Sequence, residues 1–240
     1  MKRLLLFIVM VLAILGIAYG NPVEEKLPNI PEEQAEAAED PNYRITDISV
    51  LMEVDMDKKL LTEVKDAVSY YPQDILTAFN DEGWKVMIVS TIDFTDSRYE
   101  GESDIEPNLT VGLTNYKTKI IQVKDMGLTG AVRLKLLHEM AHYADSYYDY
   151  PSYTDDFMAL YDKYKDSYVE YEFLGVTKNK ENEVDLKYAT SNAQEFFACG
   201  MKDYLYYPEY LKSDYPELDK YFETLLKSGY KKESYAQKKS

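Results

Sequence analysis

Residues 130–148 read GAVRLKLLHEMAHYADSYY. Apolar side chains recur in this stretch with a period of about 3.6 residues, which is the period of an α-helix. The pattern therefore predicts one helix over the whole stretch, with an apolar stripe that faces the protein core. That stripe is formed by Leu134, Leu137 and Ala141.

The chain has two histidines, His138 and His142, and both lie in this predicted helix with Glu139 directly after the first. Positions i and i+4 share one face of a helix, so both imidazoles can reach a single ion. Glu139 lies about 100° round the helix, where it can act on a water molecule at that ion. The spacing predicts two zinc ligands and a general base. The alternative is a surface helix that carries two histidines without any function.

Zinc in a catalytic site needs a third protein ligand, which must come from a later part of the chain. The best candidate is Glu195, because the large apolar residues that follow it should draw its carboxylate towards the core. A buried carboxylate needs a cation or hydrogen-bond donors. Ser191 and Gln194 match a capping box that starts a helix here, so Glu195 could instead serve the helix dipole in the first turn. The competing ligands are Glu170, Glu172, Glu181 and Glu183.

Two further polar residues lie close to these candidates. Asp145 follows His142 by three residues on the same helix face, and its short side chain favours a role in supporting a histidine over binding the ion. Cys199 follows Glu195 by four residues, and we interpret it as a small core residue rather than a ligand.

Composition limits the classes of function that are open to the chain. It has 240 residues, and its 43 acidic and 27 basic side chains give a net charge of −16. Nothing in so acidic a chain would neutralise a phosphate backbone, so nucleic acid is not an expected partner. With 45% hydrophobic residues the chain can bury a sizeable core, and its length suits one domain with appendages.

The first residues resemble an export signal. Lys2 and Arg3 precede an uncharged run that ends near Tyr19, and Ala18 and Gly20 fit the small residues of a signal peptidase site. We therefore expect residues 1–20 to be removed and the mature chain to be secreted, with no membrane attachment. The alternative is an uncleaved segment that tethers the protein to the membrane.

The mature chain reads as an acidic linker, one domain and a tail. Residues 21–42 are rich in proline and glutamate and form a linker or a short pro-segment. The domain spans 43–230, and 231–240 is a polar tail. A helical pattern broken at Pro72 comes first, then strands, then more helices, which indicates an α+β fold. The predicted helices are 58–80, 130–148, 155–172, 191–206 and 217–227, and the predicted strands are 84–92, 109–115 and 119–124.

Two stretches, HEMAHYAD at 138–145 and YATSNAQEFFA at 188–198, resemble the anthrax lethal factor-like metalloprotease domain, a group that includes the secreted Pro-Pro endopeptidases. The resemblance implies a zincin-like fold of the gluzincin type, with a small mixed sheet, an HExxH active-site helix and a helical C-terminal subdomain. It implies Glu195 as the third zinc ligand. It also implies that Tyr188, seven residues earlier, points its hydroxyl at the reacting carbonyl. The Pro-Pro endopeptidases carry a tryptophan in the loop before the substrate-facing strand, and residues 98–108 contain none.

Together these patterns predict a monomeric, secreted zinc endopeptidase with one Zn²⁺ per chain. His138, His142 and Glu195 would hold the metal, and Glu139 and Tyr188 would act in catalysis. The partner would be an extended peptide or protein segment, with proline-containing segments among the expected targets, bound along the strand at 109–115. A buried interior position is the alternative for that strand. The alternative functions are a non-catalytic binding or adhesion protein on the same scaffold, and a structural surface protein with a tyrosine-rich face.

Overall fold

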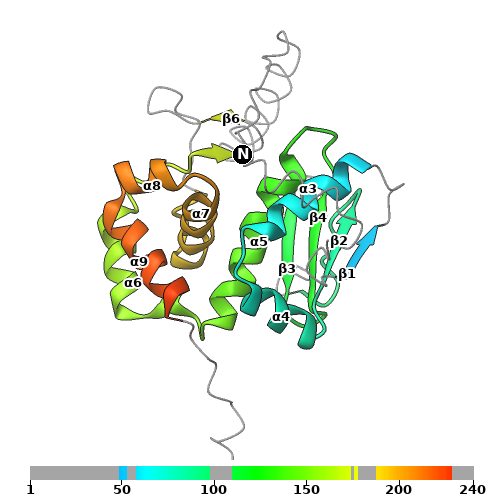
Figure 1. Ribbon diagram of the computed structural model, residues 1–240, viewed down its shortest axis with the longest axis horizontal. Helices are drawn as coiled ribbons and strands as arrows, with labels where there is room; N and C mark the ends of the chain where they lie inside the picture. Colours follow the sequence, from blue (N-terminus) through cyan, green and yellow to red (C-terminus); the bar gives the residue numbers. More distant parts are fainter. Residues whose placement is uncertain (1–48, 53–57, 98–109, 174–175, 178–187, 229–240) are drawn as a thin grey trace, which may run out of the picture. The chain divides into compact units, whose positions relative to one another are not determined.

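The computed structural model describes residues 49–52, 58–97, 110–173, 176–177 and 188–228 (Figure 1). All of them belong to one compact unit, Ile45–Ser240. The predicted signal peptide, the linker, the loop at 98–108 and the polar tail lie outside the described residues. Among the residues that are described, no helix is both long and apolar enough to cross a membrane.

The described elements alternate at first and then become helical. The strands are β1 (Ser49–Met52), β2 (Lys85–Val89), β3 (Gly112–Asn115), β4 (Ile120–Lys124), β5 (Glu172–Phe173) and β6 (Val176–Thr177). The helices are α3 (Lys58–Ser69), α4 (Gln73–Asp81), α5 (Ala131–Tyr147), the 3-10 turn η1 (Pro151–Tyr153), α6 (Asp155–Tyr164), α7 (Ala193–Tyr206), α8 (Pro208–Asp214) and α9 (Pro216–Lys227). The predicted α+β class and helical C-terminal part are therefore confirmed.

A four-stranded mixed sheet holds the first half of this unit together. Its order is β1-β2-β4-β3, with β1, β2 and β4 parallel and β3 antiparallel to β4. The predicted hairpin between the last two strands is confirmed, since Asn115 pairs with Ile120 across the turn. β3 lies at the edge of the described sheet, so the prediction of an edge strand is also confirmed. β2 is shorter than the predicted strand at 84–92: it begins after Trp84, whose ring packs against Phe79 and Tyr143, and it ends at Val89.

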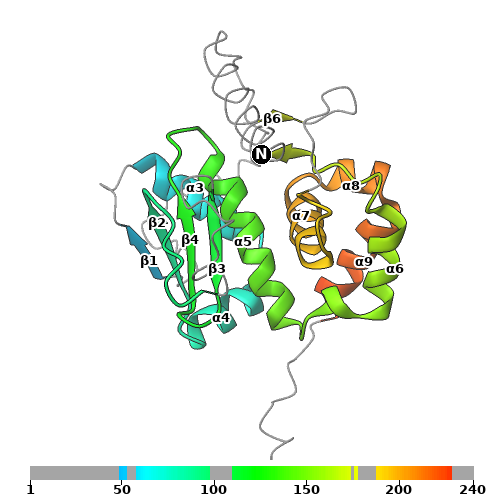
Figure 2. The ribbon, with the colours of Figure 1, turned by 180° about the vertical axis from the view of Figure 1, so that it is seen from behind.

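Helices α3, α4 and α5 cover one face of this sheet (Figures 1 and 2). The predicted break at Pro72 is confirmed: α3 ends at Ser69, and Pro72 is the residue directly before α4. Proline has no backbone N–H to donate, so it is tolerated at the start of a helix and not in its interior. The side chains of Ile75 and Phe79 from α4 are fully buried in the core beneath the sheet.

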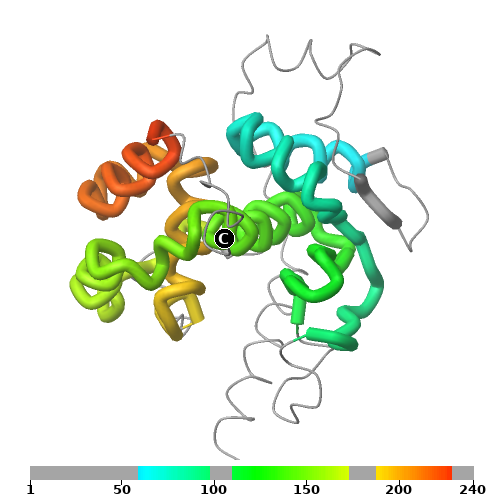
Figure 3. The backbone as a smooth tube through the Cα atoms, turned by 90° about the horizontal axis from the view of Figure 1, so that it is seen from below, coloured from blue at the N-terminus to red at the C-terminus, as the bar shows by residue number. Residues whose placement is uncertain are grey.

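Helix α5 runs through the middle of the unit, with the sheet on one side and the C-terminal helices on the other (Figure 3). Almost all of its residues from Ala131 to Asp145 are buried. The buried surface of α5 is thus wider than the single apolar stripe predicted from the sequence. Other elements cover the helix on both sides, so it has no polar face towards solvent.

The start of α5 is fixed by a residue from another helix. Gly130 precedes the helix with a φ of +81°, a left-handed conformation that side chains other than glycine rarely adopt. Its N–H donates to the Glu63 carboxylate of α3 at 2.9 Å, and Arg133 N–H donates to the same carboxylate at 3.4 Å. Glu63 therefore satisfies N–H groups that the first turn of a helix leaves without partners.

Two predictions about the C-terminal helices need correction. The predicted helix at 155–172 ends at Tyr164, because the chain turns so that the Tyr168 hydroxyl can donate to Asp203 on α7 at 2.7 Å. The helix at 191–206 is capped by Asn192 rather than Ser191: the Asn192 side chain accepts from Glu195 N–H at 2.9 Å. Both residue types are good caps, so the sequence left a one-residue ambiguity.

Candidate metal centre

Two elements that are distant in the sequence bring three predicted ligands together. His138 and His142 lie one turn apart on α5, and Glu195 lies in the first turn of α7. Oε2 of Glu195 is 3.2 Å from Nε2 of His138 and 3.5 Å from Nε2 of His142. The possible ligand atoms of the three residues all lie within 4.8 Å of one another.

This donor set fits a metal ion. All three side chains are buried, and both imidazole Nε2 atoms point to the same carboxylate oxygen. A buried carboxylate beside two converging imidazoles can share a cation, and two nitrogen donors with one oxygen donor suit a transition metal such as zinc. Three protein ligands also leave one coordination position open, as catalytic sites do.

The charges of the three residues depend on one another. Burial favours the neutral form of Glu195, but His142 and His138 outweigh it and hold the pKa of Glu195 well below its usual range. Burial and the Lys135 ammonium lower the pKa of His138. His138 is therefore readily present as the neutral imidazole that a metal requires.

Glu195 owes its position to the way α7 begins. The Asn192 cap places it in the first turn, and the next two residues, Phe196 and Phe197, are fully buried. Both rings pack against Phe157 of α6, while Glu195 on the same helical turn faces the two histidines. The sequence offered a first-turn role and a ligand role as alternatives, and the geometry is compatible with both at once.

Glu139 is buried beside the histidines and is engaged through both carboxylate oxygens. Oε1 lies 3.0 Å from Nζ of Lys135, and Oε2 accepts from Thr114 Oγ1 at 2.9 Å. Burial would raise the pKa of Glu139, but the Lys135 ammonium and the histidines outweigh burial, so the pKa is lowered. The carboxylate is thus ionised at neutral pH, which a general base requires.

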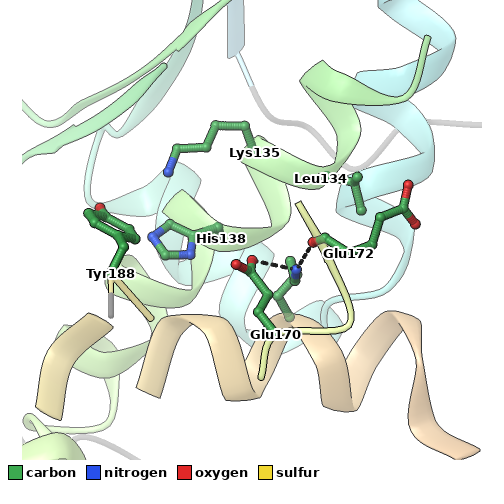
Figure 4. Close-up of a pocket in the computed structure, with 7 residues that line it drawn as sticks. Leu134, Lys135, His138, Glu170, Glu172 and Tyr188 are labelled. Atoms are coloured by element: carbon green, nitrogen blue, oxygen red, sulfur yellow. Dashed lines mark hydrogen bonds and ion pairs between the residues drawn. The ribbon is translucent and has the colours of Figure 1, made fainter. Parts of the chain in front are cut away.

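Tyr188 reaches the same site from the loop that precedes α7. Its ring lies 6.3 Å from that of His138, centroid to centroid, and Figure 4 shows the two side by side. The residue as a whole is 49% exposed, but its hydroxyl lies close to the carboxylates of Glu195 and Glu139. Burial of the hydroxyl and these negative charges raise its pKa well above the usual value. The group therefore keeps its proton and can donate a hydrogen bond.

The remaining sequence candidates take other roles. The Asp145 carboxylate accepts from Ser152 N–H at 2.9 Å and from Ser152 Oγ at 2.7 Å, so it ties η1 to α5 and does not support a histidine as predicted. Glu170 is paired with Lys202 at 2.6 Å, and Glu172 accepts from the Tyr207 hydroxyl. Glu181 and Glu183 lie outside the described residues.

The sequence did not single out two residues that contact Glu139. Lys135 is four residues before Glu139, a spacing that places opposite charges on one helix face, so the signal was present. Thr114 lies on β3, 25 residues away in the chain, and nothing local in the sequence connects it to the site.

A small cavity lies beside these residues (Figure 4). Its lining includes Lys135, His138 and Tyr188 of the candidate metal centre, together with the paired Lys202 and Glu170. His138, Glu170 and Cys199 also form a second group with possible ligand atoms close together. Because Glu170 already binds the Lys202 ammonium, the group with His142 and Glu195 is the better metal site.

The fold is similar to the solved structure of the Pro-Pro endopeptidase from Paenibacillus alvei, with a TM-score of 0.54 and 18% sequence identity. The match covers 75% of this chain and 99% of that protein. No profile of a known protein family matches the sequence, and no curated protein does. At this identity, the likeness shows that the two chains share a fold.

Proposed function

We propose that this chain is a zinc-dependent endopeptidase of the anthrax lethal factor-like group. The observation that carries the proposal is the position of Glu195 Oε2 between the Nε2 atoms of His138 and His142. A catalytic zinc site needs such a set of three ligands. The likeness to a structure named as a Pro-Pro endopeptidase supports a peptide as the substrate.

Each candidate residue has a definite task in this chemistry. His138, His142 and Glu195 would hold zinc, which polarises the scissile carbonyl and lowers the pKa of water to about 7. Glu139 would accept a proton from the attacking water and pass it to the departing amine. The Tyr188 hydroxyl would donate a hydrogen bond to the oxygen on which negative charge develops.

The substrate would bind as an extended strand. β3 lies at the edge of the described sheet, and its residue Thr114 touches Glu139, so the edge and the proposed general base are adjacent. Pairing with a sheet edge requires a flexible segment of the target, such as a linker or a stalk. We propose exposed segments of extracellular or surface proteins, proline-containing ones among them, as targets.

The proposed setting follows from the sequence. Residues 1–20 would direct export and be removed. Residues 21–42 would form a linker before the protease domain at 43–230, and residues 231–240 would form a tail. The mature protein would then be secreted and act as a monomer with one zinc ion.

Turnover of a peptide library tests the function. We expect cleavage that stops with a chelator and returns when zinc is added back. A chain that binds zinc and peptides without cleaving any of them would favour the alternative of a binding protein on the same scaffold.

A further inference from the structure

The buried lysine on α5 has a specific partner. Nζ of Lys135 lies 3.0 Å from Oε1 of Glu139, and only 7% of Lys135 and 4% of Glu139 are exposed. Removing two charges from water is unfavourable unless they lie close together and have hydrogen-bond partners. The short distance between these two buried groups therefore indicates a specific ion pair. The two residues lie one turn apart, and the rigid helix fixes their separation.

The second oxygen of Glu139 is held from a different element. Thr114 Oγ1 on β3 is 2.9 Å from Oε2 and also 2.9 Å from the backbone oxygen of Glu139. The carboxylate therefore has the Lys135 ammonium of α5 at one oxygen and the Thr114 hydroxyl of β3 at the other. The single proton of that hydroxyl is shared between the carboxylate and the backbone oxygen. With both oxygens engaged, rotation of the carboxylate breaks at least one contact.

Gly112 leaves the space that this arrangement needs. A Cβ atom at position 112 would lie 2.5 Å from Cε of Lys135 and 2.6 Å from Oε1 of Glu139, both closer than real contacts allow. The backbone of β3 thus passes directly over the ion pair. Only glycine permits the strand, the lysine stem and the carboxylate to pack together here.

We propose that Lys135 is a positioning residue for the general base: its ammonium, opposite Thr114 and beneath Gly112, holds the Glu139 carboxylate in one orientation beside the metal ligands. The inference rests on the proposed function, in which Glu139 takes a proton from water. Orientation matters because a small misplacement of a reacting group lowers the rate steeply. Lys135 itself touches neither the ion nor the substrate in this role.

The first test measures the pairing without any catalysis. In metal-free protein, Lys135→Met should lower the urea midpoint of unfolding, because it leaves a buried carboxylate unpaired. Adding Glu139→Gln to that variant should restore at least half of the loss. The matched control is the exposed pair of Glu223 and Lys227 on α9, also four residues apart, for which no such restoration is expected. If the shifts in urea midpoint caused by Lys135→Met and Glu139→Gln simply add in the double variant, the proposal is overturned.

The second test measures positioning. Lys135→Met should lower kcat by about 10- to 100-fold with KM and zinc content nearly unchanged, because orientation of the base is lost. Lys135→Arg should recover part of the rate. In a Glu139→Gln background the Lys135→Met change should cause no further loss. Gly112→Ala, which keeps every charge, should lower kcat in the same way.

The outcomes separate this inference from the function on which it rests. An active wild-type chain whose Lys135→Met variant keeps full kcat would overturn the positioning role and leave the protease intact. A wild-type chain without peptidase activity in the presence of zinc would overturn both.

Discussion

The sulfur of Cys199 lies 3.5 Å from Nδ1 of His138, while Nε2 of the same ring faces Glu195. An imidazole that gives its Nε2 lone pair to a metal carries its proton on Nδ1, and that proton needs an acceptor. Burial raises the pKa of the Cys199 thiol, so the group is neutral and offers its sulfur to the ring. Cys199, which the sequence indicates as a core residue, is thus also in contact with a proposed metal ligand.

Loss of this acceptor should weaken metal binding. We expect Cys199→Ala to lower zinc affinity by about 10-fold, the lower end for residues that orient a metal ligand. Cys199→Ser, which keeps an acceptor, should stay closer to the wild type. Competition with a chromophoric chelator measures both. Equal affinity of the alanine variant and the wild type would show that the sulfur only packs.

The three ligands should be required for the ion. We expect about one zinc per chain, and we expect His138→Ala, His142→Ala and Glu195→Ala each to remove it. Glu172→Gln is the control, since that residue was a competing ligand and contacts Tyr207 instead. Metal analysis after dialysis measures the zinc content of each variant. Full zinc content in Glu195→Ala would exclude Glu195 as the third ligand.

Glu139→Gln should separate binding from chemistry. The amide keeps the shape of the side chain but cannot accept the proton, so turnover should fall by about 100-fold or more with zinc retained. Initial rates with a fluorogenic peptide, measured beside zinc content, test this. Wild-type activity in this variant would contradict the proposed mechanism.

Tyr188→Phe should affect the chemical step more than substrate binding. Removal of one donor to a developing oxyanion costs about 2.7–4 kcal/mol, which corresponds to a fall in kcat of about 100- to 1000-fold. Zinc content and KM should change little. Tyr153→Phe is the matched control, because that tyrosine is 62% exposed. Similar kinetics for both variants would remove Tyr188 from the mechanism.

Cleavage products should show which segments the site accepts. We expect proline to be enriched within a few residues of the cut bond, since proline-containing linkers remain extended and exposed. Mass spectrometry of products from a random peptide library measures the enrichment. A profile without proline near the bond would exclude this preference and leave the zinc chemistry untouched.

The local parts of the site could be predicted from the sequence, because they depend on one helix. The spacing of His138, Glu139 and His142 is a property of α5 alone, and the structure places them as expected. Glu195 stayed ambiguous because its role depends on how α7 packs against α5. The contact of Thr114 with Glu139 could not be predicted, since it arises only when β3 is laid beside α5.

Errors in the fold have the same origin. The periodicity at 155–172 continues past Tyr164, but Tyr168 leaves the helix to reach Asp203 on α7. The full burial of α5 was also missed, because periodicity within one helix does not show that neighbours cover it on both sides. Long-range packing decided both cases against the local pattern.

His138 and Glu195 lie 57 residues apart in the chain, on helices α5 and α7. An ion bound by these two residues and His142 would therefore act as a cross-link that closes a long loop, in a protein whose single cysteine is free. Such a cross-link stabilises the folded chain by mass action, by about 2.7 kcal/mol when the free ion is at 100 times its dissociation constant. A chelator can remove it and added ion can restore it, so resistance to unfolding would follow the supply of the metal.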